Sequence, residues 1–180
     1  MLTRNLFLLA CLAIAIGGCS EQKAPLVNNQ SGFEIKTLSG ETKKVSVKPS
    51  DGRFNDLIID SGGDKPVIFS FFTTTCPECA KKFPHMIDMQ NRYKDQIVLL
   101  GVLVENKTVE EIADFAQFHQ LNYPIVLGAG AFRLADAVGG VRMIPATHIY
   151  EGNGKYTTHF VGAVPQEMLE TRIDSILKAQ

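Results

Sequence analysis

The chain has 180 residues, of which 45% are hydrophobic and 21% are charged, so most of it has the composition of a folded globular domain and not of a disordered segment. Its 18 basic and 19 acidic side chains leave a formal net charge of -1, which gives no field to hold a polyanion and argues against nucleic acid as a partner. At roughly 100–200 residues per domain, the length fits one domain with a sizeable core.

The first 18 residues have the pattern of an export signal. Arg4 precedes an apolar run over residues 6–16, and small residues follow it. At about 1.5 Å per residue, the run is too short for the roughly 30 Å apolar core of a bilayer, so a cleaved signal is favoured over a permanent membrane helix. We therefore expect residues 1–18 to be a signal peptide.

The end of this segment, Ile16-Gly17-Gly18-Cys19, resembles the lipobox of bacterial lipoproteins, in which the Cys becomes the acylated first residue after cleavage. The resemblance implies lipidation of Cys19 and a mature protein held on a membrane surface, because several acyl chains together bind stably. Ser20 stands where lipoproteins retained at the inner membrane carry Asp, which favours the outer membrane. A soluble secreted protein cleaved near Gly18 is the alternative.

The mature chain is expected to begin with a lipidated tether over residues 19–32, which is polar and has no periodicity, followed by one folded domain at residues 33–180. Alternating or nearly continuous β-prone runs predict strands at residues 33–38, 43–47, 67–72, 97–104, 123–127, 146–151 and 156–162. Apolar positions at helical spacing predict helices at residues 77–93, 109–119, 132–138 and 165–177, and a further short helix is expected at residues 54–59.

Turn residues predict that the first two and the last two of these strands form hairpins, around Ser39-Gly40 and Gly152-Asn153-Gly154. Between the two hairpins, strands alternate with helices. This order indicates an α/β fold in which helices cover both faces of a mixed, largely parallel central sheet.

After processing, two thiols remain, Cys76 and Cys79, because Cys11 leaves with the signal peptide and Cys19 is blocked by lipid. A two-residue spacer closes too short a loop to stabilise much as a structural disulfide. A zinc site would need further ligands such as a second cysteine pair. The pair is therefore expected to be redox-active, with no metal and no cofactor besides its own disulfide; metal binding and an inert buried pair are the alternatives.

The CPEC pair follows the strand at residues 67–72 and opens a helix with Pro77 at its first position, where the missing N–H costs nothing. Free backbone N–H groups and the positive end of the helix dipole would then face the sulfur of Cys76 and favour its thiolate. We expect Cys76 to attack and the more buried Cys79, one turn along, to resolve the mixed disulfide. Glu78 is the nearest carboxylate, either as a functional group or as a solvated charge at the start of the helix.

VIFSFFTTTCPECAKKFP at residues 67–84 and MIPAT at residues 143–147, together with the order of elements, resemble the thioredoxin-like superfamily and, more narrowly, the TlpA/ResA-type thiol-disulfide oxidoreductases of bacterial envelopes. The resemblance covers about residues 33–177. It implies a three-layer thioredoxin-like fold with an N-terminal hairpin and an inserted helix and strand between about residues 108 and 127.

The same resemblance implies that Pro84 kinks the active-site helix and that the Ile144–Pro145 bond is cis and lies against the disulfide. A cis bond at this place would present the backbone of Ile144 as a short edge to an extended substrate segment. A trans Pro145 that simply opens the following strand is the alternative.

Three positions depart from the family pattern. Thr75 stands where the family often has Trp, so the rim that faces the substrate is smaller and more polar. Lys82 stands where TlpA-like reductases often carry a Glu that transfers protons, and Ser70 where thioredoxins place a buried Asp. The proton acceptor for Cys79 is therefore unassigned.

These features predict a monomeric, lipid-anchored thiol-disulfide oxidoreductase of the cell envelope or periplasm that exchanges electrons with exported protein thiols and disulfides. A membrane thiol protein would supply the electrons. The resemblance favours a reductase, with cytochrome c apoproteins as a substrate class. A disulfide-forming oxidase is a variant, because the Pro-Glu spacer does not fix the reduction potential. A copper chaperone that uses both thiolates, with Met143 or His148 close by, and a redox-inert interaction module are the alternatives from other classes.

Overall fold

The computed structural model describes residues 32–50, 52–60 and 63–180. The expected signal peptide, the lipidation site Cys19 and all of the tether except Gly32 lie outside this part of the chain. Within the described ranges, no helix is both long enough and apolar enough to cross a membrane.

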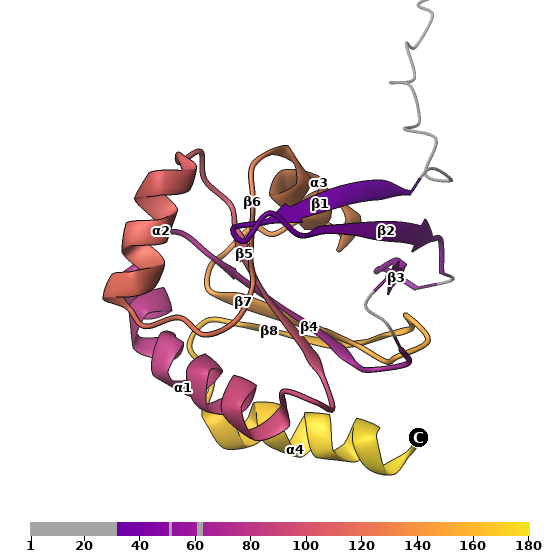
Figure 1. The fold of residues 1–180 in the computed structure, drawn as a ribbon. Helices are drawn as coiled ribbons and strands as arrows, with labels where there is room; N and C mark the ends of the chain where they lie inside the picture. Colours follow the sequence, from indigo (N-terminus) through magenta and orange to yellow (C-terminus); the bar gives the residue numbers. More distant parts are fainter. Residues whose placement is uncertain (1–31, 51, 61–62) are drawn as a thin grey trace, which may run out of the picture.

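Eight strands form one mixed sheet in the order β3-β2-β1-β6-β5-β4-β7-β8 (Figure 1). The three strands at its centre are parallel: β4 (Val67–Phe72), β5 (Val98–Leu103) and β6 (Ile125–Leu127). Antiparallel strands flank them, with β7 (Ala146–Tyr150) and β8 (Tyr156–Val161) on one side and β1 (Phe33–Thr37), β2 (Thr42–Lys48) and β3 (Asp56–Ile59) on the other. All six residues of β4 are buried, as expected for a central strand covered on both faces.

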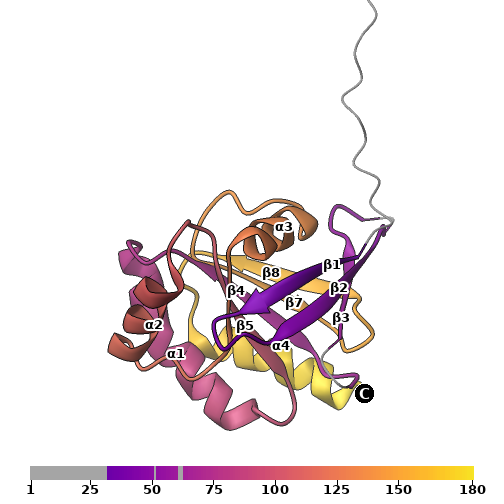
Figure 2. The same ribbon diagram turned by 45° about the horizontal axis from the view of Figure 1, so that its top comes forward.

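Helices cover both faces of the sheet, which confirms the α/β thioredoxin-like architecture (Figure 2). On one face, α1 (Pro77–Tyr93) packs against α2 (Val109–Phe118) and α4 (Gln166–Lys178) over the side chains of Ile68 and Phe72. On the other face, α3 (Ala129–Ala137) packs over Phe69 and Phe71. Successive side chains of β4 thus point alternately into two separate cores.

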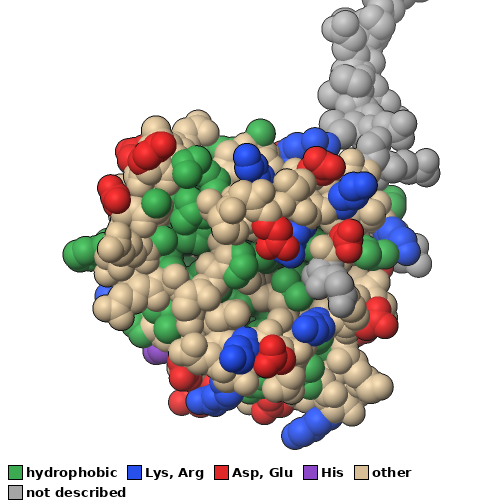
Figure 3. All heavy atoms as spheres, in the orientation of Figure 1, with side chains coloured by type: hydrophobic (Ala, Val, Ile, Leu, Met, Phe, Trp, Pro, Cys, Tyr) green, Lys and Arg blue, Asp and Glu red, His purple; other side chains and the backbone are tan. Residues whose placement is uncertain are grey.

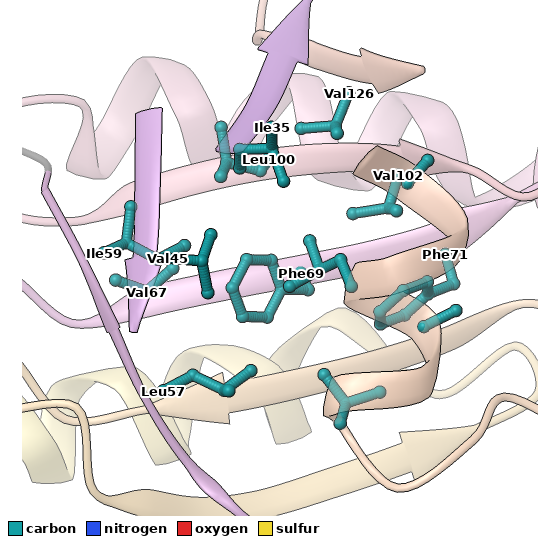
Figure 4. Packing of buried hydrophobic residues seen from close by; sticks show 14 of the residues in the cluster. Ile35, Val45, Leu57, Ile59, Val67, Phe69, Phe71, Leu100, Val102 and Val126 are labelled. Carbon is teal, nitrogen blue, oxygen red and sulfur yellow. The ribbon is translucent and has the colours of Figure 1, made fainter. Parts of the chain in front are cut away.

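The second face is completed by β1, β2 and β3, which curl over the centre of the sheet and enclose the core shown in Figure 4. As a result, β3 meets the turn between β7 and β8, at the opposite end of the strand order. The Leu57 N–H donates to the Gly154 carbonyl at 2.8 Å, and the Asp56 carboxylate accepts from the Tyr156 N–H at 2.9 Å. Gly154 has a φ of +87°, and a Cβ there would lie 2.8 Å from the Leu57 carbonyl oxygen, so glycine suits this approach.

The prediction of a short helix at residues 54–59 is wrong, because Asp56–Ile59 forms strand β3. Leu57 and Ile59 are buried and alternate with two less buried neighbours, which is the period of a strand. Four residues are too few to distinguish the 3.6-residue period of a helix from the two-residue period of a strand. Here the pairing of β3 with β2 favours the strand. The other expected elements are present, with ends that differ by up to three residues.

The surface carries both signs of charge. On the face shown in Figure 3, basic and acidic side chains lie intermixed, and no area of one sign extends across it. The exposed ion pairs of α1 follow the same pattern: Glu78 with Lys81, and Asp88 with Arg92.

The imidazole of His148 on β7 lies inside the core that β1 to β3 enclose. It is 3% exposed, its ring centroid lies 5.5 Å from that of Phe71, and it stacks on His159 at 5.1 Å. Its Nδ1 atom has no hydrogen-bond partner among the described residues. Burial, together with the neighbouring His159, lowers the pKa of His148 to about 4.

Replacing His148 with Phe should flatten the pH dependence of folding stability. The unfolded chain takes up the proton near the ordinary pKa of 6.5, whereas the folded chain resists it down to about 4. This contribution to wild-type stability is complete well above pH 6.5 and is lost as the pH falls toward 4, by about 2.5 kcal/mol at pH 4.5. Urea unfolding at pH 7 and pH 4.5 should therefore show a smaller difference in His148→Phe than in wild type.

His119→Gln serves as the control, because it removes an imidazole that is only partly buried. An unchanged pH dependence in His148→Phe would contradict the expectation.

Candidate active site

The junction between β4 and α1 places Cys76 at the start of a helix. Cys76 is the N-cap of α1, with extended backbone angles of φ -90° and ψ 107°, and Pro77 is the first helical residue. The Cys79 N–H donates to the Sγ atom of Cys76 at 3.1 Å. The sulfur of Cys76 thus lies at the positive end of the helix dipole and accepts one of the free amide hydrogens there.

Cys76 and Cys79 are joined by a disulfide, with their Cα atoms 5.2 Å apart. The two sulfurs differ in access. Cys79 is 1% exposed in a cluster with Phe72 and Phe83, whereas Cys76 is only partly buried at the edge of that cluster. An incoming thiolate can therefore reach the Cys76 side of the bond.

The pairing of β7 with β4 brings the MIPAT segment to the same place. Ala146 pairs with Phe71, so the preceding residue Pro145 lies beside the connection from β4 to Cys76. The Ile144–Pro145 bond is cis, and the Pro145 carbonyl accepts from the Gly162 N–H at 2.7 Å. The Ile144 side chain packs against the cluster that holds both cysteines.

A surface groove of about 500 Å³ runs along this loop. Its lining is largely apolar and includes side chains from four parts of the chain: Thr73, Val104, Phe132, Val141, Met143 and Ile144. Met143 is 65% exposed. Around Ile144 the groove therefore offers apolar surface to a partner.

Two other expected site residues lie on the outer side of α1. Glu78 is exposed, and its carboxylate pairs with Lys81 at 2.6 Å, so it faces solvent while Cys79 faces the core. Pro84 lies inside α1 and is exposed. Because it has no N–H, it cannot bond to the carbonyl four residues before it, at Ala80.

A carboxylate that no sequence motif indicates holds the connection before Cys76. Glu105 follows β5, and its Oε1 atom accepts from the Thr74 N–H at 2.6 Å. The strands β4 and β5 are parallel neighbours, so the residues that follow each of them meet at one edge of the sheet. The sequence contained a signal for this contact: Glu105 is an acidic residue just after β5, and β5 is the neighbour of the strand that precedes Cys76.

Lys82 is the only Lys, Arg, Asp or Glu residue in the described part of the chain that is buried, at 3% exposure. Its Nζ atom donates to the Thr147 hydroxyl on β7. Burial lowers the pKa of Lys82 to about 8. The sequence identified Lys82 as a departure from the family pattern but did not show that its amine is inside the protein.

The copper alternative would place His148 beside the two cysteines. Within the described ranges, no three His, Cys, Asp or Glu side chains are grouped so that they could hold a metal ion. His148 contacts Phe71, on the face of the sheet away from Cys79, so it does not join the cysteines.

Residues 32–157 match the AhpC/TSA family, and the chain belongs to this family. Among curated relatives, Thioredoxin-like protein YneN from Bacillus subtilis (strain 168) is 26% identical over 144 residues, which is 79% of this chain and 75% of that protein. Thiol-disulfide oxidoreductase ResA from Halalkalibacterium halodurans is 29% identical over 144 residues, or 80% of this chain and 73% of that protein.

Solved structures agree on the fold. The crystal structure of StoA from Bacillus subtilis superposes with a TM-score of 0.60 at 21% identity, covering 79% of this chain and 96% of that one. The expected resemblance to ResA-type proteins is therefore confirmed. The protein is an enzyme with a thioredoxin-like fold, a thiol-disulfide oxidoreductase.

Replacing Glu105 with Ala should loosen the connection that leads to Cys76. The Thr74 N–H would lose a charged acceptor, and a hydrogen bond to a charged group contributes about 1.5–3 kcal/mol. We expect the unfolding free energy of the oxidised protein, from urea denaturation, to fall by about 1–2 kcal/mol.

Two variants control this measurement. Glu105→Gln keeps an acceptor oxygen and should lose less than half as much stability. Glu110→Ala removes an exposed carboxylate in the first turn of α2 and should cost about 0.5 kcal/mol. Equal losses in Glu105→Ala and Glu110→Ala would show that the carboxylate does not hold the loop.

Proposed function

We propose that Cys76 and Cys79 are the redox pair of this enzyme, and that it reduces disulfides of exported proteins in the cell envelope. The observation that carries the proposal is the difference between the two sulfurs: the accessible one accepts an amide hydrogen at a helix start, and its partner one turn along is buried. This arrangement suits one cysteine to attack and the other to resolve.

In the reducing direction, the Cys76 thiolate attacks one sulfur of a substrate disulfide, and the other substrate sulfur leaves as a thiolate. Cys79 then loses its proton and attacks the Sγ atom of Cys76, which releases the second substrate thiolate. Two electrons pass to the substrate, and the pair ends as the disulfide present in this structure. A membrane thiol protein would return the pair to the dithiol.

The groove beside Ile144 and Pro145 is the proposed place for the substrate segment. An extended chain laid along this loop would pair with the backbone of Ile144 and place apolar side chains against Phe132 and Met143. The contribution of backbone pairing fits an enzyme that accepts several partners, because main-chain atoms do not select a sequence.

The site and the start of the domain lie on different sides of the molecule. Both views show β1 beginning at the right, whereas α1 begins at the left (Figures 1 and 2). If Cys19 carries lipid and residues 19–32 form a tether, as we propose, the active site would face away from the membrane. Cytochrome c apoproteins are the substrate class that the resemblance to ResA-type reductases supports.

A Cys79→Ala variant should accumulate mixed disulfides on Cys76 in the native envelope, because the resolving thiol is gone. Acid quenching followed by non-reducing gels and mass spectrometry would identify the trapped proteins, and cytochrome c apoproteins should be among them. The Cys76→Ser, Cys79→Ala double variant should trap nothing. Equal trapping by both variants would exclude Cys76 as the attacking residue.

The direction of electron transfer is tested separately. Alkylation of the wild-type protein in quenched cells should find Cys76 and Cys79 mostly as a dithiol, because a reductase must be reduced before it meets its substrate. A pair that is mostly disulfide would instead identify an oxidase.

Replacing Cys19 with Ser in the full chain should remove the protein from the membrane fraction of a bacterium with two membranes. Wild type should partition with outer membranes, and Cys11→Ser, which changes only the signal peptide, should do the same. Recovery of Cys19→Ser in the outer membrane at wild-type levels would exclude the lipid anchor.

A further inference from the structure

We propose that the side-chain amine of Lys82 exchanges a proton with the thiol of Cys79 each time the disulfide opens or closes. This inference rests on the proposed role of Cys79 as the resolving residue. It supplies the proton-transfer group that the family pattern leaves unassigned in this chain.

The first support is the position of the two residues on α1. Residues three apart on a helix are neighbours on one face, and both Cys79 and Lys82 are buried on the face toward the sheet. Long side chains on a helix lean toward its N-terminus, so the side chain of Lys82 covers the preceding turn. That turn carries Cys79.

The second support is the group that holds the amine. Lys82 Nζ donates to the hydroxyl of Thr147, which pairs with Ser70 on the neighbouring strand β4. Ser70 lies on the same face of β4 as Phe72, and Phe72 packs against Cys79. The hydroxyl of Thr147 therefore holds the Lys82 amine on the side of α1 where the buried sulfur lies.

The third support is the lack of a counter-charge. No ion pair in the described part of the chain includes Lys82. Lys82 donates to Thr147 on β7, and Thr147 pairs with Ser70 on β4 and with Phe160 on β8. The residues three positions away from Lys82 on α1 are Cys79 and His85. The charged groups Glu78, Lys81 and Asp88 lie on the exposed side of α1.

An ammonium group that is buried without a carboxylate is costly, so it gives up its proton readily. Burial brings the pKa of Lys82 to about 8, which is close to the ordinary value of about 8.5 for a thiol. Proton transfer between two groups of similar pKa is efficient in both directions. A partner of this kind suits a residue that must alternate between thiol and thiolate.

An incoming thiolate bonds to the Sγ atom of Cys76, the bond between the two cysteine sulfurs breaks, and its electron pair stays on Cys79. The Lys82 ammonium gives its proton to that thiolate and becomes a neutral amine. In the return step, the neutral amine takes the proton back, and the Cys79 thiolate attacks Cys76 and expels the substrate sulfur as a thiolate.

Stopped-flow reaction of the reduced enzyme with excess Ellman's reagent separates the two cysteines. The first release of thionitrobenzoate reports attack by Cys76, and the second, which does not depend on reagent concentration, reports attack by Cys79 on the mixed disulfide. In wild type the second rate should rise with pH and level off near pH 8. In Lys82→Met it should be at least tenfold slower at pH 7 and should keep rising above pH 9.

Lys82→Arg separates proton transfer from charge, because the guanidinium keeps a positive donor for Thr147 but does not release its proton. Its second phase should be as slow as that of Lys82→Met, and recovery of the wild-type rate would overturn the proposal. Lys81→Met removes the same charge from the exposed neighbour and should behave like wild type. A first phase that is unchanged in every variant would show that Cys76 and the fold are intact.

The outcomes also separate this inference from the proposed function. Absence of both phases in wild type would overturn the role of the cysteine pair itself. A normal first phase with a second phase that does not respond to Lys82 would overturn only the role of Lys82.

A measurement on the unchanged protein gives a further test. Methylation of the Lys82 amine as a function of pH, followed by mass spectrometry, should give a higher pKa in the reduced protein than in the oxidised one, since the Cys79 thiolate stabilises the ammonium. Identical titrations in the two states would overturn the proposal.

Discussion

The antiparallel pairing between β4 and β7 is the interaction on which the rest of the site depends. Cys76 follows β4 and Pro145 precedes β7, so two segments far apart in the sequence meet only because Phe71 pairs with Ala146. The same register sets Thr147 opposite Ser70, within reach of Lys82. A shift by one residue would turn Thr147 to the other face of the sheet and carry Pro145 away from the connection that leads to Cys76. Burial of β4 on both faces holds this register in place.

Helix α1 divides the chemistry of the site between its two sides. Its outer side carries the Glu78–Lys81 ion pair in solvent, and its inner side carries Cys79 and Lys82 among apolar neighbours. Because the helix starts at the surface, Cys76 both gains the free amide hydrogens and stays open to a partner. A single secondary structure element thus supplies an activated sulfur, a protected sulfur and a buried amine at successive turns.

The sequence predicted the parts of this site that depend on local pattern. A continuous β-prone run identified β4, helical spacing identified α1, and the CPEC and MIPAT motifs located the junction. Strand β3 was missed because its four residues show their period only once they pair with β2. The contact between Glu105 and Thr74, and that between Lys82 and Thr147, were missed for a related reason. Each joins segments whose proximity follows from the sheet register, which local periodicity does not encode.

The presence of Lys82 where TlpA-like reductases often carry Glu has a physical explanation in burial itself. Desolvation disfavours the charged form of either residue, so it raises the pKa of a carboxyl group and lowers that of an amine. Burial thereby moves the pKa values of these two oppositely charged side chains toward each other, into the range in which a thiol titrates. The requirement at this position is then a buried group that can hold or release one proton near neutral pH, and not a charge of a given sign. Arg fails this requirement because burial does not bring its guanidinium into that range, whereas Lys meets it here, buried and donating to the hydroxyl of Thr147.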